Sequence, residues 1–179
     1  MAANLFLIGL RGTGKSTVGP LLAERLGLPF FDADAELEAT AGRSIREIFA
    51  AEGEPPFRDL EEKLLVALIA RGPAVIATGG GVVLREANRR RLSDSGRVVW
   101  LTADHATLWQ RLQNDPAGGR QRPNLADGGM SEIEELARQR EPLYRSVAHL
   151  TISVVGRSPE QVASDIVTAC SDSSSTKAR

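Results

Sequence analysis

Short runs of apolar residues divide the chain at fairly regular intervals. Five of these runs have the length of β-strands, and they cover residues 5–8, 30–31, 74–77, 98–101 and 151–154. Four of the five show no alternation between apolar and polar positions. This pattern is typical of strands that are buried on both faces, as in a parallel sheet covered by helices on both sides.

Stretches with the apolar spacing of helices separate the strands. Two stripes with a period near 3.6 are formed by Val18, Leu21, Leu22 and Leu26, and by Leu60, Leu64, Leu65, Leu68 and Ile69. Ser44, Ser131 and Ser158 are each followed three residues later by Glu or Gln, which is a helix-capping pattern. Pro20 lies inside the first helical pattern and predicts a kink. Strands that alternate with helices predict an α/β fold, a three-layer sandwich around a parallel sheet.

The chain has 179 residues, a length that fits one compact domain, which we assign to residues 1–170. Residues 32–61 interrupt the alternation with a helical insert beside the second strand. Residues 114–129 are rich in Gly, Pro, Asn and Arg and predict a mobile lid. The polar residues 171–179 predict a disordered tail.

Composition and charge restrict the partners. A formal net charge of −1 gives no general attraction to nucleic acid or to anionic membranes, so anions have to be bound by locally placed cations. The apolar run at residues 5–10 is too short to cross a bilayer and lacks the flanks of a signal peptide. A single cysteine, Cys170, excludes an internal disulfide and fits a reducing compartment. We therefore expect a cytoplasmic protein without a nucleic-acid or membrane partner.

A glycine-rich segment follows the first predicted strand. Residues 9–16 read GLRGTGKS and match the pattern G-x-x-x-x-G-K-S/T, which cradles nucleotide phosphates between a strand and a helix. The glycines let backbone N–H groups converge on phosphate oxygens, Lys15 reaches the β- and γ-phosphates, and the Ser16 hydroxyl binds Mg²⁺. A turn that only joins strand to helix is the alternative, and the agreement of motif and position favours the nucleotide site.

Two carboxylates, Asp32 and Asp34, follow the second strand. The sequence lacks the guanine-reading segments of switch GTPases, and the third strand is followed by Thr78 and three glycines instead of the acidic pair of motor ATPases. Strand ends converge on the ligand crevice of a doubly wound sheet. We therefore expect Asp32 to face Mg²⁺ and Asp34 to face an acceptor hydroxyl. An N-cap of the following helix is an alternative reading that is compatible with both roles.

An arginine in the insert has an acidic neighbour on the same helix face. Arg58 lies among apolar residues, and Glu61 follows three positions later. An arginine braced in this way inside a cleft is suited to bind a carboxylate with two hydrogen bonds. The alternative is an exposed ion pair on the surface of a helix.

The order and spacing of these motifs resemble the shikimate kinases, which are P-loop kinases of a small molecule. The resemblance extends from residue 4 to residue 167, and its segments are residues 9–16, Asp32-x-Asp34, Gly53-Glu54, Phe57-Arg58-x-x-Glu61, Gly79-Gly80-Gly81, Arg122-Pro123 and Arg140-Glu141-Pro142-Leu143-Tyr144. It implies a five-stranded parallel sheet of order 2-3-1-4-5 with a substrate-binding insert and a lid. It also implies a monomer that uses Mg²⁺ and transfers the γ-phosphoryl of ATP to the 3-hydroxyl of shikimate, in chorismate biosynthesis.

The same resemblance implies roles at the acceptor. Arg58 and Arg140 would hold the substrate carboxylate, and Asp34 would accept hydrogen bonds from the hydroxyls. Gly80 and Gly81 would bring backbone N–H groups close to the substrate, which a side chain would prevent. Two further residues would wall the substrate ring: Phe49 and Phe57.

For the nucleotide, the resemblance implies that Lys15 and the lid residue Arg122 stabilise the transferring phosphoryl, so that the catalytic residues are Asp34, Lys15 and Arg122. Arg111 would pack near adenine, and Ser16 with Asp32 would hold the metal. The full set of ATP-binding residues is then Gly12, Thr13, Gly14, Lys15, Ser16, Thr17, Arg111 and Arg122.

Three features depart from the family pattern. The lid reads Asn124-Leu125 after Arg122-Pro123, where the family usually has two leucines. The lid carries an additional Gly118-Gly119 and a second arginine, so either Arg120 or Arg122 meets the phosphate. Arg11 replaces the Met or Pro that is frequent in the loop, and it either lines the substrate rim or points to solvent. Two other functions stay open: a kinase of another small polyol or of nucleoside monophosphates, and a nucleotide-binding regulator without transfer.

Overall fold

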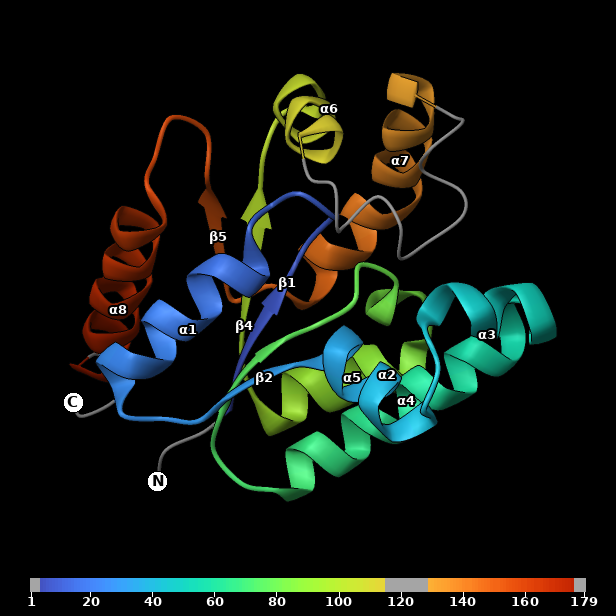
Figure 1. Cartoon of the computed structure of the whole chain (residues 1–179). Helices are drawn as coiled ribbons and strands as arrows, with labels where there is room; N and C mark the ends of the chain where they lie inside the picture. Colours follow the sequence, from blue (N-terminus) through green and yellow to red (C-terminus); the bar gives the residue numbers. More distant parts are fainter. Residues whose placement is uncertain (1–3, 115–128, 176–179) are drawn as a thin grey trace.

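A parallel sheet forms the centre of the computed structural model, which describes residues 4–114 and 129–175. Its five strands lie in the order β2-β3-β1-β4-β5 (Figure 1). They are β1 (Asn4–Ile8), β2 (Phe30–Asp32), β3 (Val75–Ala77), β4 (Gly96–Thr102) and β5 (Leu150–Ser153). All neighbouring strands pair in parallel. The predicted fold class and strand order are therefore confirmed.

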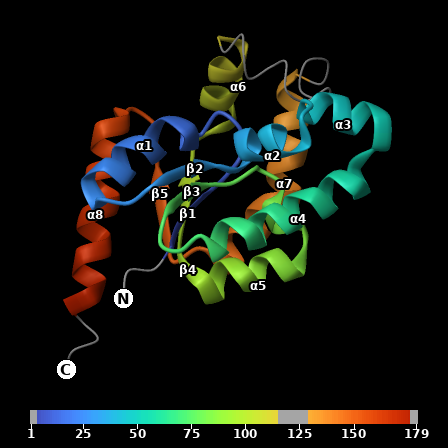
Figure 2. The same cartoon turned by 60° about the horizontal axis from the view of Figure 1, so that its bottom comes forward.

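Helices cover both faces of this sheet. They are α1 (Lys15–Leu26), α2 (Ala33–Ala41), α3 (Ile45–Glu52), α4 (Glu54–Ala70), α5 (Glu86–Ser95), α6 (His105–Gln113), α7 (Gly129–Val147) and α8 (Pro159–Ser175), with a 3-10 turn η1 at Val82–Leu84. Helices α1 and α8 pack on one face, and α4, α5 and α7 pack on the other (Figures 1 and 2). The three predicted layers are present.

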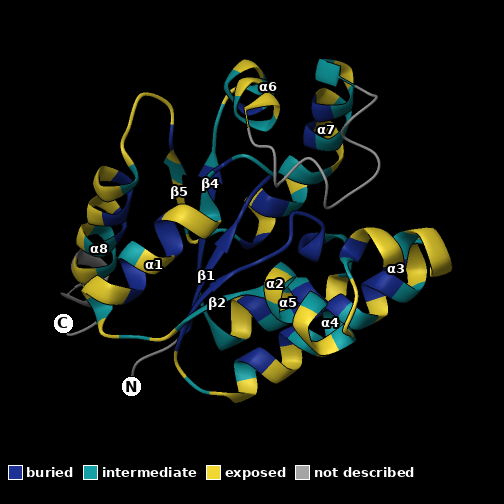
Figure 3. Cartoon of the chain, in the orientation of Figure 1, coloured by how far each residue is buried: buried dark blue, intermediate teal, exposed yellow. Residues whose placement is uncertain are grey.

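The alternation of side chains along β1 explains why two separate cores form. Leu5 and Leu7 point to the side of α1 and α8, whereas Phe6 and Ile8 point to the side of α4, α5 and α7. Every residue of β1 is buried, as the dark colour of this strand in Figure 3 shows. A strand that is covered on both faces needs apolar side chains at successive positions, which is the pattern seen in the sequence.

The insert has a small core of its own. Leu37 of α2, Ile45 and Ile48 of α3, and Phe57 of α4 form a cluster apart from the two sheet cores. Helix α3 begins with the predicted capping box, in which the Ser44 side chain accepts from the Glu47 N–H and the Glu47 side chain accepts from the Ser44 N–H. The insert is therefore a compact unit attached beside β2.

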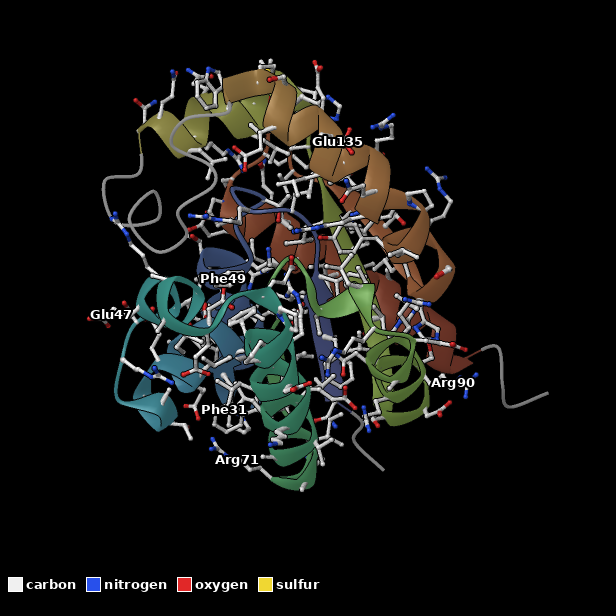
Figure 4. All side chains as sticks on the ribbon, turned by 90° about the vertical axis from the view of Figure 1, so that its right-hand side faces the viewer. Phe31, Glu47, Phe49, Arg71, Arg90 and Glu135 are labelled. Atoms are coloured by element: carbon white, nitrogen blue, oxygen red, sulfur yellow. The ribbon has the colours of Figure 1, made fainter. Side chains whose placement is uncertain are left out.

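A cation–π contact connects the end of α4 to the sheet. The guanidinium carbon of Arg71 lies 4.9 Å from the centre of the Phe31 ring (Figure 4), and Arg71 also pairs with Glu36 of α2 at 2.8 Å. These contacts join α2, α4 and β2 at the border of the insert.

Two local predictions are wrong. The tail expected to be disordered from residue 171 is helical as far as Ser175, because α8 continues through it and the Ser171 hydroxyl donates to the Val167 carbonyl one turn earlier. Residues 176–179 lie outside the described residues. Ser131 is not an N-cap, since α7 already begins at Gly129. Ser158 does form the predicted reciprocal contacts with Gln161, and Pro20 lies inside α1.

Within residues 4–114 and 129–175, every helix is either too short or too polar to cross a lipid bilayer.

The insert predicted at residues 32–61 corresponds to α2, α3 and the first part of α4. Most of the predicted lid, residues 115–128, lies outside the described part of the chain.

We predict that Gly96→Ala destabilises the sheet. A Cβ atom at this position would lie 2.2 Å from the carbonyl oxygen of Asn4, its partner in the neighbouring strand β1. Strand β1 is central and cannot move without disturbing both cores, so we expect a loss of about 1–3 kcal/mol in the free energy of unfolding, measured by urea denaturation. The control is Ser93→Ala on the exposed side of α5, which should stay within about 0.5 kcal/mol. Equal stability of the two variants would contradict the close contact.

Candidate active site

The predicted phosphate loop connects β1 to α1 at the carboxyl edge of the sheet (Figure 1). Gly9, Gly12 and Gly14 have positive φ angles of 139°, 80° and 86°, a region that favours glycine. Helix α1 begins at Lys15, and the N–H groups of a first helical turn have no partner inside the helix. The loop therefore has the strand–turn–helix geometry that offers N–H donors to a phosphate.

The side chain of Lys15 lies over this loop. Its ammonium group donates to the carbonyl oxygens of Gly9 and Leu10, at 2.9 Å each. The Thr13 hydroxyl is buried and donates to the same Leu10 carbonyl at 2.8 Å. Residues 12–17, all six predicted to bind nucleotide, line one cavity. Arg11 lines this cavity too, which favours a position at the rim of the substrate site over one that points to solvent.

Asp32 is the last residue of β2, and its two carboxylate oxygens have different partners. Oδ2 accepts from the Ser16 hydroxyl at 2.5 Å. Oδ1 accepts from the N–H groups of Asp34 and Ala35, at 3.0 and 3.3 Å, and so caps α2. Of the two carboxylates, Asp32 is thus the N-cap. The structure brings together the two predicted metal-binding residues, Ser16 and Asp32.

Asp34 lies in the first turn of α2 and lines the same cavity as the phosphate loop. Thr78 lines it from the other side, directly after β3. Its hydroxyl and its N–H both donate to the Leu7 carbonyl, at 3.1 and 3.0 Å. We gave Thr78 no role from the sequence, although its position after a strand could have identified it.

Arg58 is buried on α4, with its side chain 7% exposed. It donates to Glu61 at 2.7 Å, and the side chain of Glu61 is also 7% exposed. Burial alone would lower the pKa of the Arg58 guanidinium, but the carboxylates of Glu61 and Glu54 outweigh this effect and raise its pKa above the usual value. The alternative of an exposed ion pair is therefore wrong.

The glycine turn after β3 lies between the two predicted carboxylate-binding arginines. A Cβ atom at Gly81 would meet the Arg58 guanidinium at 2.2 Å, and one at Gly80 would lie 3.5 Å from Nη1 of Arg140. The Tyr144 hydroxyl, fully buried one turn after Arg140 on α7, donates to the Gly80 carbonyl. Tyr144 therefore joins the turn to the helix that carries Arg140. Gly80 lines the cavity of the phosphate loop.

Arg111 approaches the phosphate loop from α6. Its guanidinium donates to the Gly12 carbonyl at 3.1 Å and to the Val154 carbonyl at 3.4 Å. It connects the loop to the segment after β5, and Arg157 of that segment lines the cavity as well. Sequence reasoning missed Val154 and Arg157.

The two predicted aromatic wall residues lie in contact but differ in burial. Phe57 is fully buried in the core of the insert, so it does not form a wall of the cavity. Phe49 is half-buried and packs on Phe57, with the ring centres 4.5 Å apart. The predicted lid residues Arg120 and Arg122 lie outside the described residues.

This arrangement defines a class of enzyme. A phosphate loop between a buried strand and a helix, with a hydroxyl–carboxylate pair beside it, is the nucleotide site of a P-loop phosphotransferase. Asp34 and Gly80 line the cavity of this loop, whereas Arg58 and Arg140 lie beside the Gly80–Gly81 turn and do not line the cavity. The fold and site together are those of a P-loop kinase of small molecules.

Comparison with known proteins identifies the family. The family described as "Shikimate kinase" matches residues 11–171. A shikimate kinase of Rhodopirellula baltica is 44% identical over 95% of this chain and 91% of its own length. One of Paracidovorax citrulli is 48% identical over 84% of this chain and 81% of its own length. The solved structure "Shikimate kinase from Acinetobacter baumannii in complex with shikimate" is 36% identical, with a TM-score of 0.91, and covers 97% of this chain and 95% of that one.

The chain therefore belongs to the shikimate kinase family, and it is an ATP-dependent kinase. The family and the enzyme class that the sequence predicts are confirmed. The roles of individual residues remain predictions that rest on the geometry described above.

We predict that Gly81→Ala and Gly80→Ala differ in stability. Alanine at position 81 would overlap with the buried guanidinium of Arg58, whereas alanine at position 80 finds its nearest neighbours at 3.5 Å, an ordinary contact distance. Gly81→Ala should lose about 1–3 kcal/mol of unfolding free energy in urea denaturation, because Arg58 has to move. Gly80→Ala should lose less than about 1 kcal/mol. Equal losses would contradict the packing of Arg58 on Gly81.

Proposed function

We propose that this enzyme transfers the γ-phosphoryl of ATP to the 3-hydroxyl of shikimate and produces 3-phosphoshikimate and ADP. The observation that carries this proposal is the position of Arg58 and Arg140 beside the Gly80–Gly81 turn, in which a Cβ atom at Gly80 would lie 3.5 Å from the Gly9 carbonyl oxygen of the phosphate loop. Two arginines suit a carboxylate, and a carboxylate base suits a hydroxyl. The shikimate-bound relative from A. baumannii supports the assignment.

On the acceptor side, Arg58 and Arg140 bind the carboxylate, and the N–H groups of Gly80 and Gly81 approach the ring. Asp34 accepts the proton of the reacting hydroxyl as its oxygen attacks the γ-phosphorus. The bond between this phosphorus and the β,γ-bridging oxygen breaks, and ADP leaves. Phosphoryl transfer depends mainly on positioning and charge, and fixed arginines and N–H groups supply both.

On the nucleotide side, the N–H groups of residues 12–17 hold the phosphates, and Arg111 packs against the base. Lys15 can exchange its two carbonyl partners for phosphate oxygens, since both lie in the loop itself. The lid arginine, Arg122 or Arg120, adds positive charge to the transferring group. Each of these roles restrains the γ-phosphoryl in line with the acceptor hydroxyl.

The cofactor that we propose is Mg²⁺. Among the residues that the structure describes, no three His, Cys, Asp or Glu side chains form a preformed metal cage. Mg²⁺ fits this arrangement, because it prefers one or two protein oxygen ligands together with phosphates and water. Ser16 and Asp32, already in contact, would hold it. When bound, the ion neutralises charge on the phosphate oxygens.

The last part of the proposal concerns the cellular compartment, the oligomeric state and the partners of the enzyme. We propose a cytoplasmic monomer whose partners are ATP and shikimate, with no nucleic acid or membrane. A net charge of −1 supports the absence of nucleic-acid and membrane partners, and the single cysteine supports the cytoplasm, whereas the monomer is implied by the family resemblance alone.

The decisive test measures ADP release from Mg-ATP in a coupled assay. We expect release only with shikimate, and none above background with gluconate or AMP, because only the acid with a ring hydroxyl matches the arginines and Asp34. Release with gluconate or AMP at a similar rate would favour another small-molecule kinase. ATP binding without turnover on any acceptor would favour a nucleotide-binding regulator.

The carboxylate roles predict a selective defect in Arg58→Lys and Arg140→Lys. Lysine keeps the charge but loses the planar fork, so KM for shikimate should rise about 10- to 100-fold, as expected for lost hydrogen bonds to a charged group. KM for ATP should change less than about twofold, since neither residue faces the nucleotide. Arg46→Lys, an exposed arginine on α3, is the control. Equal increases in both KM values would contradict the assignment.

A further inference from the structure

Arg58 contacts two carboxylates that differ in their access to solvent. Glu61 is 7% exposed and lies 2.7 Å from Nη1. Glu54 is 56% exposed, and one of its oxygens accepts from both Nε, at 3.1 Å, and Nη2, at 2.9 Å. The buried carboxylate cannot leave without a large rearrangement. The exposed one can rotate into water at little cost.

The contact with Glu54 has the form of ligand binding. Nε and Nη2, on one side of the guanidinium, both donate to a single oxygen of Glu54, so Glu54 covers donors that could instead pair with the carboxylate of a substrate. Glu54 is the first residue of α4 and follows Gly53, whose φ angle is 80°. Its side chain thus reaches Arg58 from the start of the helix, over one helical turn.

We propose that Glu54 is a specificity-determining residue whose carboxylate competes with the substrate carboxylate for Arg58. It occupies Arg58 in the absence of substrate, and the acid displaces it on binding. Glu61 stays in place and keeps the buried guanidinium paired throughout. This inference rests on the proposed function, in which Arg58 binds the carboxylate of shikimate.

Two consequences follow. The apparent affinity for the acid is reduced by the fraction of molecules in which Glu54 covers Arg58. A neutral analogue of the substrate cannot replace the charge of Glu54 at Arg58, so it gains nothing at this position. Glu54 therefore lowers affinity for the acid while it protects Arg58 from unsuitable ligands.

A second role for Glu54 makes the opposite prediction. If Glu54 were a permanent brace like Glu61, its removal would leave Arg58 less well oriented and would weaken the binding of the acid. Its 56% exposure, against 7% for Glu61, favours the exchangeable role.

The test compares Glu54→Gln and Glu54→Asp with the wild-type chain by calorimetric titration of shikimate and of its neutral methyl ester. Glu54→Gln should bind shikimate about two- to fivefold more tightly, which corresponds to the loss of a partly exposed ion pair. Glu54→Asp keeps the charge at the start of α4 but is one methylene shorter, and it should show a smaller gain in the same direction. Binding of the ester should not change.

The matched control is Glu52→Gln, because Glu52 is also an exposed partner of an arginine, Arg43, within the insert. It should leave both affinities unchanged. Unchanged or weaker binding of shikimate by Glu54→Gln would overturn the inference, and so would an equal gain for acid and ester. If the wild-type chain bound no shikimate, the proposed function would fail together with the inference, whereas wild-type binding without a gain in Glu54→Gln would overturn the inference alone.

Discussion

Both faces of the sheet are covered by helices, and this constraint decides where the chemistry of the enzyme can be placed. A polar side chain in the middle of β1 or β3 would be buried without a partner, at a cost of about 2–7 kcal/mol. The polar groups of the site therefore occur at strand ends. Asp32 is the last residue of β2, Thr78 follows β3, and the phosphate loop follows β1. Because all strands are parallel, these ends share one edge, and the active site forms there.

The side chain of Asp32 connects the two halves of this site. One oxygen contacts Ser16 on the nucleotide side, and the other caps the helix that carries Asp34. Ser16 and the start of α2 are therefore connected through a single carboxylate. Asp32 thus caps α2 with one oxygen, while its other oxygen contacts Ser16, its partner in the proposed metal site.

The features that the sequence predicted depend on local patterns. The buried strands, the phosphate loop and the cap at Ser44 each involve neighbours within a few residues, so their spacing is visible in the chain.

The features that the sequence analysis missed depend on which of several possible contacts a side chain makes, or on contacts between residues far apart in the chain. Phe57 turns into the core of the insert because α2 and α3 offer it apolar partners. Helix α8 continues through polar residues because each added residue of a formed helix gains a hydrogen bond without needing a core. No local pattern predicted the contact between Tyr144 and Gly80, which are 64 residues apart.

The hydrogen bonds of Arg111 have a consequence for the choice of nucleotide. Two nitrogens at the edge of its guanidinium donate to the main-chain carbonyls of Gly12 and Val154, so in the proposed nucleotide site the base would meet the flat face of this group. A guanidinium face stacks on any purine, since stacking does not read the edge of the ring. In the role that we propose for it at the base, Arg111 would therefore contribute affinity without distinguishing adenine from guanine.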